Sequence, residues 1–181
     1  MLVNGAAGGV GTYTVQLAAA MGADVTAVCS SRNVELVGSL GAQRVVAYDA
    51  QDFLADGARY DAFVDNIGNR PLTECRRALA ADGVYVMVSG PKDGNWIGPY
   101  RRALAGRARF AFTSQRFANF IAEEGASELQ ELVRYIEAGQ LRSVIDRHYP
   151  LADTAAAVRY VATAHARAKV VIDVVDAAPA T

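Results

Sequence analysis

The stretch NGAAGGVG, residues 4–11, decides the fold of this chain. It begins within an expected strand, Leu2 to Ala6, and leads into a helical pattern. Such a turn presents backbone N–H groups and the positive end of a helix to an anion. Gly8 lets the backbone approach a phosphate, and Gly11 lets the helix pack closely on the strand. Ala6 stands where the G-x-G-x-x-G template has its first glycine, and alanine is tolerated there when its φ angle is negative.

Composition excludes several classes of protein. The chain has 181 residues, 52% of them hydrophobic, and a formal net charge of -1. These values indicate a globular protein and argue against a nucleic acid or an anionic membrane as the main partner. No apolar run approaches the roughly 20 residues that cross a bilayer, and no signal-peptide pattern opens the chain. Cys29 and Cys75 fit no ligand spacing, so we expect small buried side chains in a reducing, cytoplasmic setting.

Short apolar runs alternate with helix-length amphipathic stretches along the first part of the chain. This alternation predicts a doubly wound, six-stranded parallel sheet covered by helices, a Rossmann architecture. A helix that begins at Pro71 is expected to run past Leu79 towards Gly83. The expected strands are Leu2–Ala6, Asp24–Val28, Arg44–Ala47, Asp61–Asp65, Val84–Val88 and Arg109–Phe112.

The last third of the chain has a different pattern. Ser127 and Gln130 form a capping-box pattern before a helix that is expected to end at Gly139. A C-terminal strand-helix-strand annex follows, with expected elements at Val144–Tyr149, Asp153–Ala164 and Lys169–Val175. The sequence therefore divides into a nucleotide-binding domain at 1–142, the annex at 143–176 and a tail at 177–181.

The end of the second expected strand indicates which dinucleotide binds. An NAD-binding chain places an acidic residue about 20 residues beyond the glycines, where its carboxylate accepts a hydrogen bond from the ribose 2′-hydroxyl. No Asp or Glu occurs between Val25 and Val34. Ser30, Ser31 and Arg32 instead offer hydroxyl and guanidinium donors that suit a 2′-phosphate. The pattern favours NADP(H) over NAD(H).

The glycines also satisfy the G-x-x-x-G-x-G turn of short-chain dehydrogenases. Those enzymes need a tyrosine with a lysine four residues later, because the lysine lowers the pKa of the phenol. The two lysines of this chain are Lys92 and Lys169, and the residues four positions before them are Val88 and His165. The short-chain interpretation is therefore excluded, and a methyltransferase is excluded by the missing ribose carboxylate.

The spacing from Ala6 to Gly11 closely resembles that of zinc-independent medium-chain dehydrogenases/reductases of the quinone oxidoreductase-like branch. The resemblance spans nearly the whole chain, through LGAQRVVAY (40–48), DAFVDNIG (61–68), GVYVMVSG (83–90) and HARAKVVIDV (165–174). It implies an oxidoreductase that transfers hydride between NADPH and a quinone, an enone, or a carbonyl or alcohol. Ala168 stands where the family has a glycine.

The resemblance and the turn chemistry together give a set of candidate cofactor-binding residues. The set is Ala6, Gly8, Gly9, Val10, Ser30, Ser31, Arg32, Tyr48, Asn66, Gly68, Ser89, Gly90 and Lys169. The lysine of the family's phosphate-binding Ser-x-x-Lys is replaced by Asn33, with Arg32 one place earlier. We expect no metal, since His148 and His165 lack zinc partners at suitable spacing. No residue is singled out as catalytic.

Full members of the family carry an N-terminal substrate domain, whereas Met1 here opens directly into the first strand. We therefore expect that domain to be absent and the annex strands to pair with each other, join the main sheet or bind a second subunit. One hypothesis is an NADP(H)-binding domain that is not competent alone. The other is a non-catalytic nucleotide-binding or dimerisation module left by truncation. The family's edge strand, expected near Phe110, predicts a homodimer, and the basic stretch YRRALAGRARF (100–110) is expected to be a solvated helix face.

Overall fold

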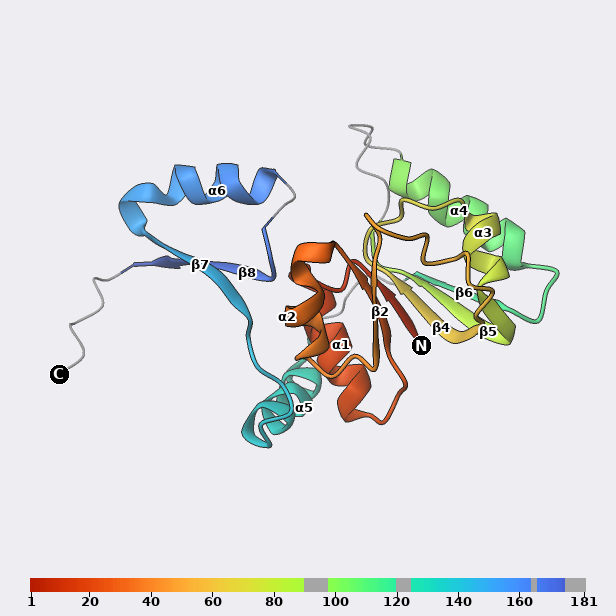
Figure 1. The fold of residues 1–181 in the computed structure, drawn as a ribbon, viewed down its shortest axis with the longest axis horizontal. Helices are drawn as coiled ribbons and strands as arrows, with labels where there is room; N and C mark the ends of the chain where they lie inside the picture. The colour runs from red at the N-terminus through yellow and green to blue at the C-terminus, as the bar shows by residue number, and fades with distance from the viewer. Residues whose placement is uncertain (90–97, 120–124, 164–165, 175–181) are drawn as a thin grey trace.

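The computed structural model describes residues 1–89, 98–119, 125–163 and 166–174. Its main body is a six-stranded parallel sheet in the order β3-β2-β1-β4-β5-β6 (Figure 1). This arrangement confirms the predicted doubly wound sheet, and the strand order reverses between β1 and β4. The strands are β1 (Leu2–Asn4), β2 (Thr26–Cys29), β3 (Arg44–Ala47), β4 (Tyr60–Asp65), β5 (Leu79–Met87) and β6 (Arg116–Asn119).

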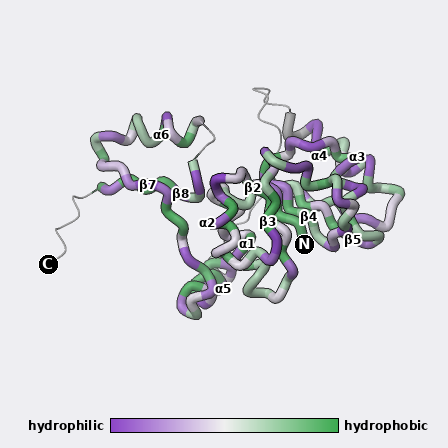
Figure 2. The backbone as a smooth tube through the Cα atoms, viewed as in Figure 1, coloured by the Kyte–Doolittle hydropathy of each residue, from purple (hydrophilic) through white to green (hydrophobic). Residues whose placement is uncertain are grey.

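Helices cover both faces of the sheet. Neighbouring residues of a central strand point to opposite sides, so each face has its own hydrophobic cluster. Leu2 packs in one cluster with Leu72 and Phe110, whereas Val3 packs in another with Val15. Figure 2 shows these central strands as mainly hydrophobic. The covering helices are α1 (Gly11–Ala20), α2 (Val34–Gly38), α3 (Leu72–Arg77) and α4 (Gly98–Phe110), with a 3-10 turn η1 (Ser31–Asn33) before α2.

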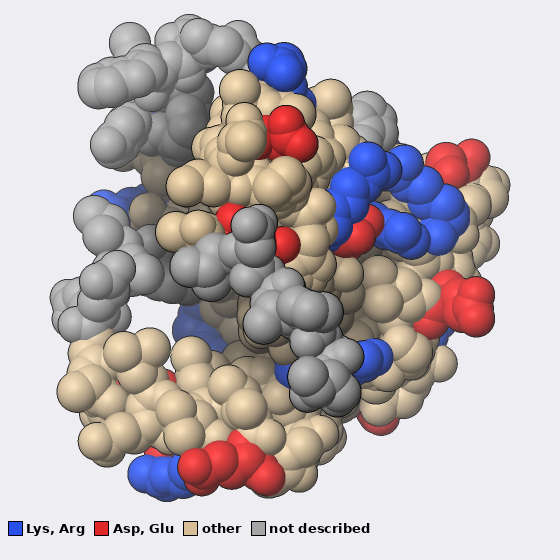
Figure 3. Space-filling model, turned by 90° about the vertical axis from the view of Figure 1, so that its left-hand side faces the viewer, with Lys and Arg blue, Asp and Glu red and all other residues tan. Residues whose placement is uncertain are grey.

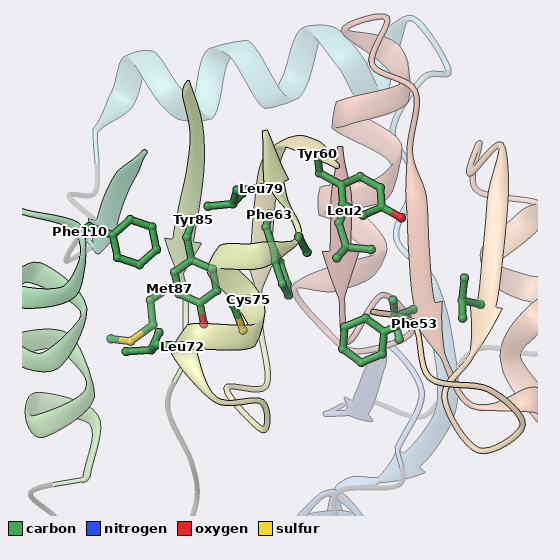
Figure 4. Packing of buried hydrophobic residues seen from close by; sticks show 13 residues of the cluster. Leu2, Phe53, Tyr60, Phe63, Leu72, Cys75, Leu79, Tyr85, Met87 and Phe110 are labelled. Carbon is green, nitrogen blue, oxygen red and sulfur yellow. The ribbon is translucent and has the colours of Figure 1, made fainter. Parts of the chain in front are cut away.

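The predicted sixth strand is wrong in position. Residues 109–112 complete helix α4 and the turn after it, and the sixth strand is β6. Figure 4 shows the ring of Phe110 beside that of Tyr85. Phe110 is only 4% exposed and the two ring centroids are 6.2 Å apart, whereas Phe112 is 97% exposed. The Phe-x-Phe spacing suggested a strand, but one phenylalanine completes the buried face of an Arg/Ala-rich helix. The edge strand expected near Phe110 is therefore also misplaced.

Two local expectations also fail. Helix α3 ends at Arg77, and Leu79 already belongs to β5, so the helix does not continue towards Gly83. The capping box does not form, because Gly125 is the N-cap residue of α5 (Ala126–Glu137) and makes no side-chain capping bond. The Ser127 hydroxyl instead donates to the Glu128 carboxylate at 2.8 Å.

The annex consists of β7 (Ile145–Pro150), a 3-10 turn η2 (Leu151–Asp153), α6 (Thr154–Ala162) and β8 (Lys169–Asp173). Its two strands pair with each other in parallel as a separate sheet, which is the first of the three expected arrangements. Figure 1 shows this small sheet beside the main body, with α6 along one face. The Ala168 N–H donates to the Ala7 carbonyl at 2.8 Å and so joins the annex to the glycine loop.

Helix α4 packs so closely on β6 that one residue has no room for a side chain. A Cβ atom at Gly106 would overlap the ring of Phe117, whereas one at Gly38 in α2 would meet only Val45 at 3.9 Å. We predict that Gly106→Ala lowers the free energy of unfolding by about 1–3 kcal/mol through overpacking. The matched change Gly38→Ala should raise it by up to about 1 kcal/mol through helix propensity. Urea denaturation measures both, and equal effects of the two substitutions would contradict this packing.

Candidate cofactor-binding site

The glycine loop is a tight turn between β1 and α1. Gly5 has a φ of +77°, and the Gly8 N–H donates to the Gly5 carbonyl at 3.1 Å. A Cβ atom at Gly11 would overlap the Gly5 carbonyl and the backbone of Ala6, so a glycine is required where the helix approaches the strand. Ala6 is fully buried and has no positive φ, as the sequence required.

A cleft of about 490 Å³ opens over this loop, at the carboxyl ends of β1 and β4. This is the point where the strand order reverses, which is where open α/β sheets bind ligands. The cleft is lined by Gly5, Gly8, Gly9, Val10, Gly11, Asn66, Ile67, Val161, Ala166, Ala168, Lys169 and Val170. The structure thus brings Gly8, Gly9, Val10, Asn66 and Lys169 together from three distant segments of the chain.

Lys169 extends from the annex over the glycine loop. Its ammonium would lie 3.3 Å from a Cβ atom at Gly9 and is 5.6 Å from the centroid of the Tyr13 ring. The N–H groups of Gly9 and Val10 have no hydrogen-bond acceptor in the described part of the chain. A positive charge beside unused backbone donors is an arrangement that suits a pyrophosphate.

The candidate residues at the ribose end lie at the carboxyl ends of the neighbouring strands β2 and β3. The Ser31 N–H and hydroxyl both donate to Asp49 Oδ1, at 2.9 and 2.8 Å. The Asn33 amide donates to the Ser30 hydroxyl at 3.0 Å, and Tyr48 is largely exposed. The hydrogen bonds from Ser31, with a smaller contribution from the charge of Arg32, lower the pKa of Asp49. Sequence reasoning missed Asp49, because nothing in the local pattern shows that β3 delivers it to Ser31.

Three other described candidates, Ala6, Gly68 and Ser89, do not line the cleft. Gly68 has a φ of +73° and lies in the turn after β4, where its N–H donates to Asp65 Oδ1 at 2.8 Å. The Ser89 N–H donates to the Asp65 carbonyl at 3.4 Å. Ala6 is buried under the loop, and Gly90 lies outside the described residues. Gly68 and Ser89 therefore shape the edge of the sheet beside the cleft.

Asp65 is a fully buried carboxylate that the sequence reasoning did not single out. Its Oδ1 accepts hydrogen bonds from the Asn4 amide at 3.0 Å and from the N–H groups of Ile67 and Gly68 at 3.1 and 2.8 Å. Its Oδ2 accepts the Tyr85 hydroxyl at 2.5 Å and lies 3.6 Å from the Arg102 guanidinium. Burial, together with the charge of Asp65, raises the pKa of Tyr85, so the phenol stays a donor.

The chain matches the family model described as zinc-binding dehydrogenase over residues 40–172. The chain belongs to this family of medium-chain dehydrogenases/reductases. It is 28% identical over 177 residues to the chloroplast envelope quinone oxidoreductase homolog of Arabidopsis thaliana, covering 96% of this chain and 52% of that protein. It is 33% identical to the mitochondrial NAD(P)H oxidoreductase RTN4IP1 of Mus musculus, covering 96% of this chain and 48% of that protein.

The solved structures agree with the sequence relatives. The quinone oxidoreductase from Coxiella burnetii superposes with a TM-score of 0.81 at 27% identity, covering 96% of this chain and 52% of that one. The quinone oxidoreductase-like resemblance is therefore confirmed, and the family is one of enzymes. The chain spans about half the length of the relatives it matches, as does the nucleotide-binding half of such an enzyme.

The family's description names zinc, but the described residues of this chain do not fit that metal. They contain no cluster of three or more His, Cys, Asp or Glu side chains. Cys29 and Cys75 belong to different hydrophobic clusters on opposite faces of the sheet. Burial raises their pKa values to about 11 and about 12, which disfavours the thiolate that binds zinc. The exposed His148 pairs with Asp173 at 3.1 Å.

Ala168 carries strain at the junction between the cleft and the annex. Its φ of +46° makes it the one non-glycine residue with a positive φ in the described ranges. The left-handed conformation costs an alanine about 1–2 kcal/mol, and a glycine at this position relieves that strain. The glycine also makes the unfolded chain more flexible, which lowers the free energy of unfolding by about 0.4–1 kcal/mol. We predict that Ala168→Gly raises the free energy of unfolding by up to about 1 kcal/mol, measured by urea denaturation. Ala166→Gly, the control, should lower it, and loss of stability in both variants would contradict the assignment of strain.

Proposed function

We propose that this chain is the NADP(H)-binding half of an oxidoreductase that transfers hydride between NADPH and a quinone, an enone, or a carbonyl or alcohol substrate. The observation that carries this proposal is the glycine loop with Lys169 above it. Gly9 and Val10 line the cleft and their N–H groups have no hydrogen-bond acceptor among the described residues, so they are available to a pyrophosphate. Gly11 keeps the helix close to β1. The relatives are named as quinone and NAD(P)H oxidoreductases, which supports the same reaction class.

The nicotinamide supplies or accepts the hydride, and the protein supplies binding, orientation and electrostatics. Lys169 would neutralise the pyrophosphate, and Asn66 and Ile67 would form the wall of the cleft beside it. At the other end, Arg32 and the Ser30 and Ser31 hydroxyls would bind the 2′-phosphate with Tyr48 beside it, which favours NADP(H). Gly68, Ser89 and Gly90 are proposed to border the nicotinamide.

The annex, residues 143–176, is proposed to pack against a substrate domain. Helix α5 leads into it and has no buried residue. Leu129, Val133 and Ile136 lie on one face of that helix and are 62%, 48% and 53% exposed. An apolar helix face of this kind needs a partner surface. The share of the relatives that lies outside the match, about half their length, supplies a candidate for it.

Two substitutions test the two ends of the proposed site separately. Lys169→Met should lower the affinity for NADPH and for NADH by about tenfold each, because both cofactors carry the pyrophosphate and lose one charged partner. Arg32→Ala should lower the affinity for NADPH by about tenfold and leave the affinity for NADH unchanged, because only NADPH carries the 2′-phosphate. Isothermal titration calorimetry measures all four affinities. Lys169→Arg, the control, should bind both cofactors as the unmodified chain does, and binding of neither cofactor by the unmodified chain would refute the proposal.

We also propose that the chain forms a homodimer in the cytoplasm. In the described part of the chain β6 pairs only with β5, so its other edge is open to a second copy.

Cys29 and Cys75 are unpaired, as in a reducing compartment. No helix among the described residues is long and apolar enough to cross a bilayer. On the face drawn in Figure 3, the largest group of basic side chains is bordered by acidic side chains.

The proposed dimer predicts a solution mass twice that of one chain. Sedimentation velocity at several protein concentrations measures it. Substituting Phe117→Pro would disturb both pairing and packing, whereas Arg116→Glu in the same strand, at an exposed position, changes only the charge of the edge. We expect Arg116→Glu to weaken the dimer with its helical content unchanged. A monomer at every concentration tested would remove the dimer from the account.

A further inference from the structure

We propose that Asp49 sets the discrimination between NADPH and NADH, by occupying the donors that a 2′-phosphate needs. This inference rests on the proposed function and specifies its ribose end. The sequence offers Ser31 and Arg32 as phosphate ligands and shows no acidic residue in their segment. The structure brings an acidic residue to them from the neighbouring strand.

Asp49 is held against Ser31 by two hydrogen bonds to one oxygen. The Ser31 N–H donates to Oδ1 at 2.9 Å and the Ser31 hydroxyl donates to the same atom at 2.8 Å. The backbone on either side of Asp49 is fixed as well. The Tyr48 N–H donates to the Cys29 carbonyl at 2.9 Å, and the Ala50 N–H donates to the Ala47 carbonyl at 3.0 Å. The carboxylate is therefore placed by β3 at the end of β2.

The electrostatics match the geometry. Arg32 lies close enough for its charge to favour the ionised carboxylate, in addition to the larger effect of the Ser31 hydrogen bonds. The carboxylate of Asp49 thus already occupies the position beside Ser31 and Arg32 that a 2′-phosphate would take. A 2′-phosphate has to displace that carboxylate from both donors and carries about two negative charges itself.

NADH does not meet this obstacle. Its 2′-hydroxyl is a donor, and an ionised carboxylate at the ribose end accepts it, as the acidic residue of NAD-binding sheets does. In those sheets the acid stands at the end of the second strand, whereas here it comes from the end of the third. Arg32 therefore attracts the 2′-phosphate and Asp49 opposes it. The preference of the unmodified chain for NADPH should consequently be smaller than that of a chain without the Asp49 carboxylate.

The test compares NADPH and NADH binding by calorimetry in the unmodified chain, Asp49→Asn and Asp49→Ser. Both substitutions remove the negative charge that opposes the 2′-phosphate, and Asp49→Ser also shortens the side chain that occupies the Ser31 donors. NADPH should therefore bind about tenfold more tightly. NADH should bind equally or more weakly, so the ratio of the two affinities shifts towards NADPH. A purely structural role of Asp49 would weaken both cofactors together and leave that ratio unchanged.

Asp52→Asn is the matched control. It removes the same charge three residues further along the chain, from a carboxylate that pairs with Arg70 at 2.8 Å and not with Ser31. The control should leave the affinity ratio unchanged. An unchanged ratio in both Asp49 variants, or a shift towards NADH, would overturn the proposal. An equal shift in Asp52→Asn would also overturn it, because net charge alone would then explain the effect. Binding of neither cofactor by the unmodified chain would refute the proposed function, and this inference with it.

Discussion

The buried carboxylate of Asp65 is the constraint on which the edge of the sheet depends. It takes donors from β1 through Asn4, from its own turn through Ile67 and Gly68, and from β5 through Tyr85. Arg102 adds a positive charge from α4. A buried charge is tolerated only when it is paired and its oxygens are satisfied, and removing one partner from such a pair typically costs about 3–5 kcal/mol. The same contacts position the turn that forms one wall of the cleft.

The cleft combines two surfaces that the chain builds by different means. The floor is local, because the strand-turn-helix of residues 2–20 needs only its glycines to approach closely. The opposite side of the cleft comes from the annex, which contacts the loop through the Ala168 N–H and the Lys169 ammonium. Ala168 and Lys169 lie more than 150 residues after the loop in the sequence. The proposed pyrophosphate site therefore depends on the tertiary contact between them as well as on the glycine motif.

The elements that the sequence predicts well are those with short-range causes. The strands β1 to β4 closely match the apolar runs predicted for them, and Gly139, with a φ of +69°, follows the end of α5 close to the predicted position. The sixth strand was misplaced because Phe110 and Phe112 alternate like a strand while the helix buries only the first of them. Asp65 and Asp49 were missed because each is defined by partners on other strands, and a strand-end aspartate resembles an ordinary turn residue.

The central claim is that the glycine loop holds the pyrophosphate of a nicotinamide dinucleotide. The most direct measurement is a titration of the ¹⁵N-labelled chain with NADPH, followed by the chemical shifts of the backbone amides. We predict the largest changes at Gly8, Gly9 and Val10, with further changes at Asn66 and Lys169, because these residues line the cleft. Unchanged amides in the loop at saturating NADPH, or changes confined to another surface, would contradict this account.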